Sequence, residues 1–175
     1  MLETERVRLR WIVEADAPAL FEIYGDPEVA RYLSRPAFTQ MAQAEKLVAT
    51  ANACYADGSS VNFAIERRED AAVIGTAMLF RFHRESRRAE IGYSMARAYW
   101  GQGYMHEALR ALIDYAFGPL GLNRIEADID PRNANSAKSL ERLGFRMEGV
   151  LRERWIVAGE VSDTGYYGLL RKDWR

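Results

Sequence analysis

The sequence predicts a single α/β domain built on one mixed sheet, because strand patterns first follow one another directly and later alternate with helical patterns. The length of 175 residues fits one domain, and 49% of the residues are hydrophobic, which is enough for a substantial core. No linker, repeat or low-complexity segment interrupts the chain. We therefore expect one domain over residues 1–175.

The first third of the chain predicts one strand followed by three helices. Residues 7–12 alternate between apolar and polar side chains and are typical of a strand. Asp16 and Thr39 each stand just before a helical pattern and are expected to cap it. The expected helices cover residues 16–24, 28–33 and 40–56.

The remaining two thirds predict strands and two further helices. Polar turns or Gly and Pro residues separate these segments. Gly144 stands where the last helix should end, at the position that favours a left-handed residue. The expected strands cover residues 61–65, 73–82, 89–95, 125–130, 145–157 and 161–170, and the expected helices run from the glycines near residue 103 to about 117 and over 133–143.

Composition and charge exclude several classes of protein. The net charge is −1, which gives no footprint for nucleic acid or for an anionic membrane. No apolar run approaches the roughly 20 residues of a membrane span, and the first residues do not resemble a signal peptide. Cys54 stands alone and is expected to be a buried or half-buried thiol, while His83 and His106 have no Cys partners for zinc. We expect a cytoplasmic protein without a metal.

Two glycines stand directly before a helical pattern. Gly101 and Gly103 precede Met105 and Leu109, which begin an apolar stripe at helical spacing. Glycines allow positive φ and close approach of an anion, and a helix start offers free N–H groups. The segment is not a Walker loop, because no Gly-Lys-Ser/Thr follows, and the dinucleotide fingerprint is incomplete. The pattern suits a phosphate site, although on its own a Gly-x-Gly turn before a helix is more often a plain turn.

Two segments resemble the GNAT N-acetyltransferases. Residues 98–109, Ala-Tyr-Trp-Gly-Gln-Gly-Tyr-Met-His-Glu-Ala-Leu, resemble the acetyl-CoA loop of that family, in the wording of the branch related to the RimJ/RimL ribosomal-protein acetyltransferases. Trp100 and Met105 depart from the general loop pattern of the family. Residues 130–145 are similar to its second signature, with Asn133 and Ser136 on the Asn-x-x-Ser positions. The N-terminal strand and the C-terminal hairpin also resemble this branch.

The resemblance implies a fold, a cosubstrate and a reaction. The fold would be a mixed, mostly antiparallel sheet flanked by helices, with a cofactor cleft between two splayed parallel strands. The reaction would move an acetyl group directly from acetyl-CoA to a primary amine, either a protein α-amine or a small molecule, and a homodimer is a further expectation. The residues implied for cofactor binding are Ser94, Met95, Trp100, Gly101, Gln102, Gly103, Tyr104, Met105, His106, Asn133 and Ser136.

Glu90 is the first choice for a general base. Strand alternation places it on one face with Gly92 and Ser94, and some members of the resembling family use a glutamate at this strand position. The alternative is a surface glutamate, or one paired with Arg87 or Arg88. Glu153, on the C-terminal hairpin, competes for the role of base. Glu107 is expected to be structural, in the first turn of its helix.

The remaining chemistry needs an oxyanion donor and an acid for the leaving thiolate. A backbone amide near Met95 fits the first role. Ser136 is the candidate for the second, by resemblance, and its alternative is a hydroxyl that caps a helix. Tyr166 and Tyr167 are weaker candidates. Two rival functions stay open, a non-catalytic acyl-CoA sensor and a purely structural domain.

Overall fold

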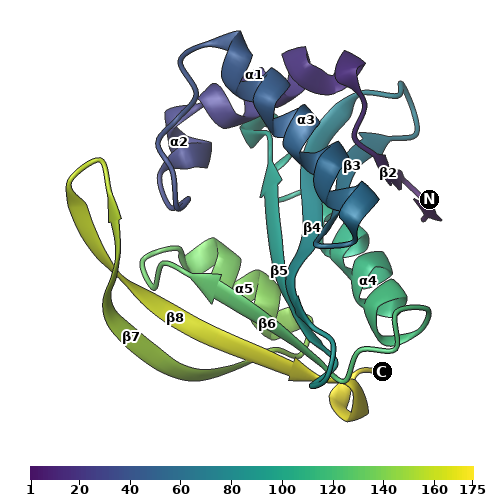
Figure 1. Ribbon diagram of the computed structural model, residues 1–175, viewed down its shortest axis with the longest axis vertical. Helices are drawn as coiled ribbons and strands as arrows, with labels where there is room; N and C mark the ends of the chain where they lie inside the picture. Colours follow the sequence, from purple (N-terminus) through teal and green to yellow (C-terminus); the bar gives the residue numbers. More distant parts are fainter.

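An eight-stranded sheet forms the centre of the computed structural model, which describes all 175 residues (Figure 1). The strand order is β1-β2-β3-β4-β5-β6-β8-β7, and only β5 and β6 pair in parallel. The strands are Leu2–Glu3 (β1), Val7–Trp11 (β2), Val61–Arg67 (β3), Val73–His83 (β4), Arg88–Met95 (β5), Arg124–Ile129 (β6), Arg146–Val157 (β7) and Glu160–Leu170 (β8).

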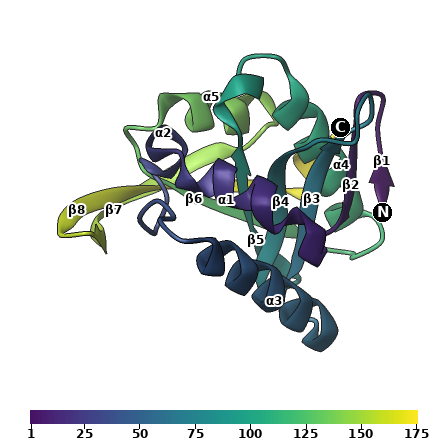
Figure 2. The same cartoon turned by 90° about the horizontal axis from the view of Figure 1, so that it is seen from above.

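Helices cover both faces of this sheet. Figure 2 shows α3 on one side of the strands and α5 on the other; α1 packs with α3, and α4 shares an apolar cluster with α5. None of the helices is long and apolar enough to cross a bilayer. The helices are Ala17–Gly25 (α1), Pro27–Ala30 (α2), Met41–Asp57 (α3), Tyr104–Phe117 (α4) and Ala134–Arg142 (α5), and 3-10 turns lie at Glu14–Asp16, Arg97–Tyr99 and Arg171–Asp173.

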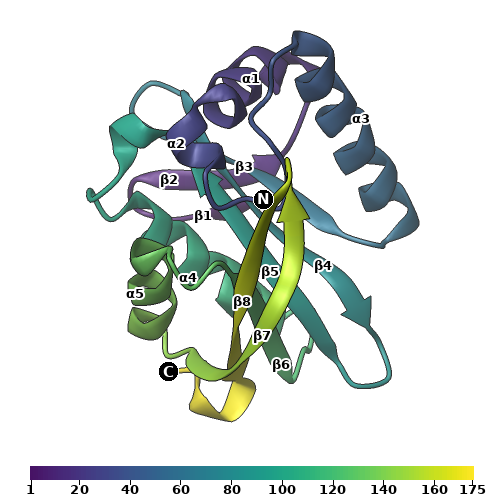
Figure 3. The ribbon, with the colours of Figure 1, turned by 90° about the vertical axis from the view of Figure 1, so that its left-hand side faces the viewer.

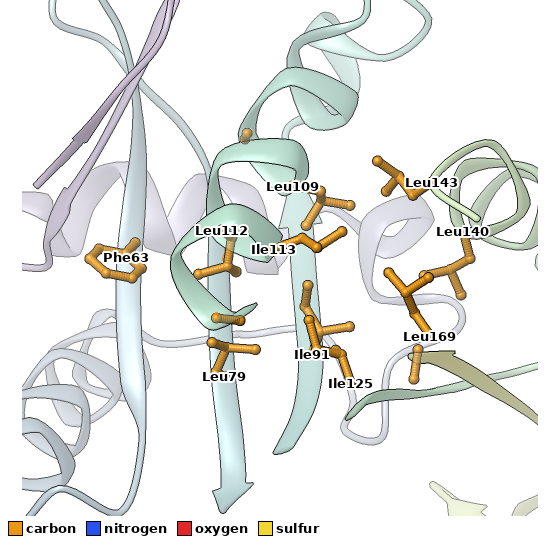
Figure 4. Close-up of a cluster of buried hydrophobic side chains, with 14 of the residues drawn as sticks. Phe63, Leu79, Ile91, Leu109, Leu112, Ile113, Ile125, Leu140, Leu143 and Leu169 are labelled. Atoms are coloured by element: carbon orange, nitrogen blue, oxygen red, sulfur yellow. The ribbon is translucent and has the colours of Figure 1, made fainter. Parts of the chain in front are cut away.

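Two apolar clusters hold the helices on the sheet. The larger one joins α4 and α5 to the strands, and Figure 4 shows Leu109, Leu112 and Leu140 reaching toward strand residues such as Ile91 and Ile125. Fully burying a side chain of this size stabilises the fold by about 1.5–3 kcal/mol. The second cluster packs α1 and α3 against the opposite face. Each helix layer is therefore fixed independently of the other.

The parallel pair opens soon after it begins. β5 and β6 share only three paired positions, the last of which joins Glu90 to Glu126. β5 then continues along β4 to Met95, while β6 continues along β8 to Ile129. The two strands diverge in Figure 1, and the expected splay is confirmed.

The expected strands and helices all form, with small differences at their ends. The two-residue strand β1 was not expected, and the predicted helix over residues 28–33 is the shorter α2. Two predicted caps are wrong. The Asp16 carboxylate does not cap α1 but binds Arg10, whose guanidinium lies 2.7 Å away. Gln40, not Thr39, is the N-cap of α3, because the Gln43 amide oxygen accepts the backbone N–H of both residues.

Candidate active site

A cavity of about 930 Å³ lies where β5 and β6 diverge. Its walls come from the segment that joins α2 to α3, from α3, from β4 to β6, from the start of α5 and from the β7–β8 hairpin. Figure 3 shows this hairpin crossing in front of the strands. Residues of both faces of β5 line it, Glu90 and Ser94 from one face and Tyr93 from the other. The cavity therefore reaches both sides of the sheet through the gap that the splay leaves.

Glu90 is a buried carboxylate in this cavity, with 5% of the residue exposed. Its partner is Arg81, whose Nη1 lies 2.9 Å and 3.2 Å from the two carboxylate oxygens. Burial raises the pKa of Glu90, Arg81 lowers it in part, and the charges of Asp128 and Glu126 raise it further. The net effect is a raised pKa, which favours proton exchange nearer to neutral pH.

The predicted alternative partners of Glu90 are not used. Arg88 binds Glu126 instead, at 2.8 Å, and only Arg81 reaches Glu90. Arg81 does so from a bulge in β4, where its φ is +52°. Alternation alone gives no sign of this bulge, so the sequence does not reveal the partner.

Ser136 meets Tyr93 rather than the backbone of its own helix. The two hydroxyls lie 2.7 Å apart, and both residues line the cavity. The cap of α5 is Asn133, whose side chain accepts the Ser136 N–H at 3.1 Å, so the capping alternative for Ser136 is wrong. Burial raises the pKa of Tyr93 to about 12, which keeps its hydroxyl protonated at neutral pH, so either hydroxyl can donate to the other. Tyr93 was not among the predicted site residues.

The glycine turn presents a row of free donors. Gly101 and Gly103 have φ values of +73° and +84°, which confirms the expected use of positive φ. The first helical bond of α4 runs from the Glu107 N–H to the Gly103 carbonyl, and none of the six N–H groups from residue 101 to 106 donates within the protein. Arg6 Nη1 fixes the turn by donating to the Gln102 carbonyl at 3.0 Å.

Two side chains tie this turn to its surroundings. The Glu107 carboxylate accepts the Thr4 hydroxyl at 2.6 Å and the Arg6 N–H at 2.7 Å, so it has the structural role that the sequence predicts. Trp100 Nε1 donates to the Met95 carbonyl at 2.7 Å and joins the turn to the end of β5.

The cavity brings together only part of the predicted site. Its lining includes Glu90, Ser94, Asn133 and Ser136, whereas Met95 at the end of β5 and residues 100–106 beyond it are not part of the lining. Glu153 also lies outside, on an exposed bulge of β7. Of the weaker candidates, Tyr166 donates to Glu126 at 3.0 Å and Tyr167 is buried in the core. Cys54 is half-buried at the rim, as expected.

Comparisons of the sequence and of the structure with known proteins all match acetyltransferases. Residues 6–146 match the family described as Acetyltransferase (GNAT) domain. The "Uncharacterized N-acetyltransferase p20" of Bacillus licheniformis is 39% identical over 173 residues, which cover 99% of this chain and 97% of that protein. The "[Ribosomal protein uS5]-alanine N-acetyltransferase" of Escherichia coli is 32% identical over 124 residues, 70% of this chain and 64% of that one. The solved structure of a GNAT-family acetyltransferase from Bacillus anthracis superposes with a TM-score of 0.87 at 26% identity, covering 98% of both chains.

Proposed function

Since this chain belongs to the GNAT acetyltransferase family, we propose that it moves an acetyl group directly from acetyl-CoA to a primary amine, with the two reactants meeting in the gap between β5 and β6. The observation that carries the proposal is the cavity itself, because it joins the two faces of the sheet past the last β5–β6 pair at Glu90 and Glu126. A thioester on one face and an amine on the other would then be in reach of each other.

The glycine turn fits the pyrophosphate of acetyl-CoA. Six free N–H groups and the start of a 14-residue helix together favour an anion at residues 101–106. Arg110 and Arg142 also bring positive charge near the turn. Burial lowers the pKa of His106, and the charges of these two arginines lower it further. The pantetheine arm would run from this turn along the open edge of β5 toward Tyr93, with Asn133 and Ser136 on its far side.

Three groups of this chain fit the chemical demands of the transfer. Glu90, ionised beside Arg81, would take a proton from the bound amine directly or through water. The backbone N–H near Met95 would stabilise the charge that develops on the thioester oxygen. Ser136, held by Tyr93 at 2.7 Å, would donate to the departing sulfur. No side chain in the cavity forms a nucleophile and base pair, which agrees with direct transfer.

An acyl-CoA sensor without turnover is the alternative function. It needs the glycine turn but gives no reason for a buried carboxylate with a raised pKa beside the gap. Release of free thiol from acetyl-CoA, measured with a panel of amines and N-terminal peptides, separates the two. The relative from Escherichia coli acts by name on a ribosomal-protein alanine, so peptides that begin with alanine belong in the panel. Binding of acetyl-CoA without thiol release for any amine would favour the sensor.

A further inference from the structure

Arg35 is a half-buried cation without an anionic partner. Its guanidinium carbon lies 4.3 Å from the ring centre of Tyr24 and 4.8 Å from that of Phe38, and the side chain forms no ion pair and no hydrogen bond. No buried polar side-chain atom in the protein lacks a partner, so the donors of Arg35 face accessible space. That space is the cavity, which Arg35 lines.

The platform under Arg35 is rigid. Tyr24 is buried, and its hydroxyl lies 2.6 Å from the Thr76 hydroxyl on β4. The Phe38 N–H donates to the Tyr24 carbonyl at 2.9 Å, which holds the two backbones together, and the Phe38 ring is itself buried. A guanidinium stacked on two buried rings loses little freedom when it binds, and its planar donors match a carboxylate in two hydrogen bonds.

Most other cations of the cavity are already paired. Arg81 binds Glu90, and Arg132 binds Asp130 and Glu160 at 2.6 Å each. Arg31 has only a distant partner, since Glu28 lies 3.8 Å away on the surface. Lys46 of α3 also lines the cavity without an ion pair, but it is exposed and stacks on no ring. Arg35 is thus the unpaired cation of the cavity that a stacked platform holds in place, whereas Glu90 supplies negative charge in the same cavity.

The strand pairing gives the separation along the sheet between Glu90 and Thr76, the residue under the Tyr24 platform. Thr76, under Tyr24, pairs directly with Ser94 on β5. Glu90 lies four residues before Ser94 on the same face, which is a span of about 13 Å in an extended strand. A span of this size corresponds to a peptide of about three to four residues, since each residue spans up to about 3.5 Å.

We propose that the acceptor carries a carboxylate in addition to its amine, at the distance of a short peptide, and that Arg35 binds this carboxylate. The inference rests on the proposed acetyl transfer and narrows its acceptor. The inference favours peptides that carry a free carboxylate over polyamines and amino sugars, because polyamines and amino sugars offer no anion to Arg35. The carboxylate can be a C-terminus or an Asp side chain, since both have the same chemistry.

The test is calorimetric titration of the protein, saturated with CoA, with three peptides that differ in their anion. Ala-Gly-Gly has a free C-terminal carboxylate, Ala-Gly-Gly-amide has none, and Ala-Gly-Asp-amide carries the carboxylate on a side chain. We expect at least one acid to bind about tenfold or more tightly than the neutral amide, as for a charge-assisted pair. Which acid binds better identifies the source of the carboxylate.

Arg35→Gln should abolish this difference and leave binding of the neutral amide unchanged. Arg84→Gln is the matched control, because Arg84 is an exposed arginine of the β4–β5 turn that does not line the cavity. Equal affinity for all three peptides, or a difference that persists in Arg35→Gln, overturns the inference. So does a loss of thermal stability or of CoA affinity in Arg35→Gln without any change in the difference. Failure of the proposed transfer is read separately, as absence of thiol release across the amine panel.

Discussion

Two glycines with similar backbone conformations allow the proposed phosphate site to be tested apart from stability. Gly101 has φ +73° and Gly121 has φ +63°, and a Cβ added to either meets no atom within 4 Å. Alanine in this left-handed region costs about 1–2 kcal/mol, so Gly101→Ala and Gly121→Ala should be destabilised alike. For a domain of this size, each kcal/mol lowers the melting temperature by about 2–4 °C.

The two variants should differ in their response to acetyl-CoA. At a concentration about 100 times its Kd, a ligand stabilises the folded protein by about 2.7 kcal/mol, and we expect this gain in wild type and Gly121→Ala. If the new methyl group holds the phosphates away and raises Kd tenfold, the gain in Gly101→Ala falls to about 1.4 kcal/mol. Gly103→Val should lose more of this gain than Gly101→Ala, because its Cβ would lie 3.2 Å from Arg6 Nη2 and the turn itself would have to shift.

Thermal melts with and without acetyl-CoA, supported by calorimetric titration, measure these quantities. An unchanged acetyl-CoA affinity in Gly101→Ala and Gly103→Val, beside the expected loss of stability, would refute the placement of the pyrophosphate. An equal loss of affinity in Gly121→Ala would show that strain acts at a distance, and the argument from close approach would fail.

Three further predictions concern the transfer and the turn. Glu90→Gln should lower turnover strongly near neutral pH, and turnover should recover in part at high pH, where more of the amine is already free. Arg81→Gln should move the acid limb of the pH–rate profile to higher pH, because the cation that lowers the pKa of Glu90 is gone. A normal profile for Glu90→Gln would show that Glu90 is not the base. Ser136→Ala should lower kcat more than it raises the KM for acetyl-CoA, and Tyr93→Phe should do the same more weakly; reduced melting temperature with normal kcat would assign both to structure. Glu107→Gln should lower the free energy of unfolding by about 2 kcal/mol at neutral pH. Burial alone would raise the pKa of Glu107, but hydrogen bonds from Thr4 and Arg6 hold this pKa below its ordinary value, so the stability is present above the unfolded pKa and is lost as pH falls. A stability difference between variant and wild type that persists in acid would contradict this prediction.

Regular elements of this fold could be predicted from the sequence because each follows a local rule. Alternation places Glu90 and Ser94 on one face of β5, and glycine at 101 and 103 indicates the turn before α4. Pairing between distant segments has no local signal. The contact of Tyr93 with Ser136 joins a strand to a helix 43 positions away, and Arg35 stacks on Tyr24 of α1, whose hydroxyl meets Thr76 of β4.

The prediction of caps failed although the partners lie close in sequence. Asp16 is a good N-cap by residue type, and a rule based on position alone selects it. Its buried carboxylate, however, binds Arg10, six residues earlier on β2, and accepts the Val13 N–H at 2.9 Å. Residue type predicts which groups can cap, whereas the path of the backbone before the helix decides which partner is bound.

The bulge at Arg81 shows how one irregular position can set the chemistry of the cavity. Phe80 pairs directly with Glu90, so in a regular strand Arg81 would point to the opposite face. The bulge and the φ of +52° bring its guanidinium to Glu90 at a backbone cost of about 1–3 kcal/mol. A buried, unpaired carboxylate would cost more, and the ion pair offsets the strain. Because the Arg81 side chain is 50% exposed, it remains open to exchange with another cation. An incoming ammonium group is such a cation, and in displacing Arg81 it would meet an ionised Glu90 ready to accept its proton.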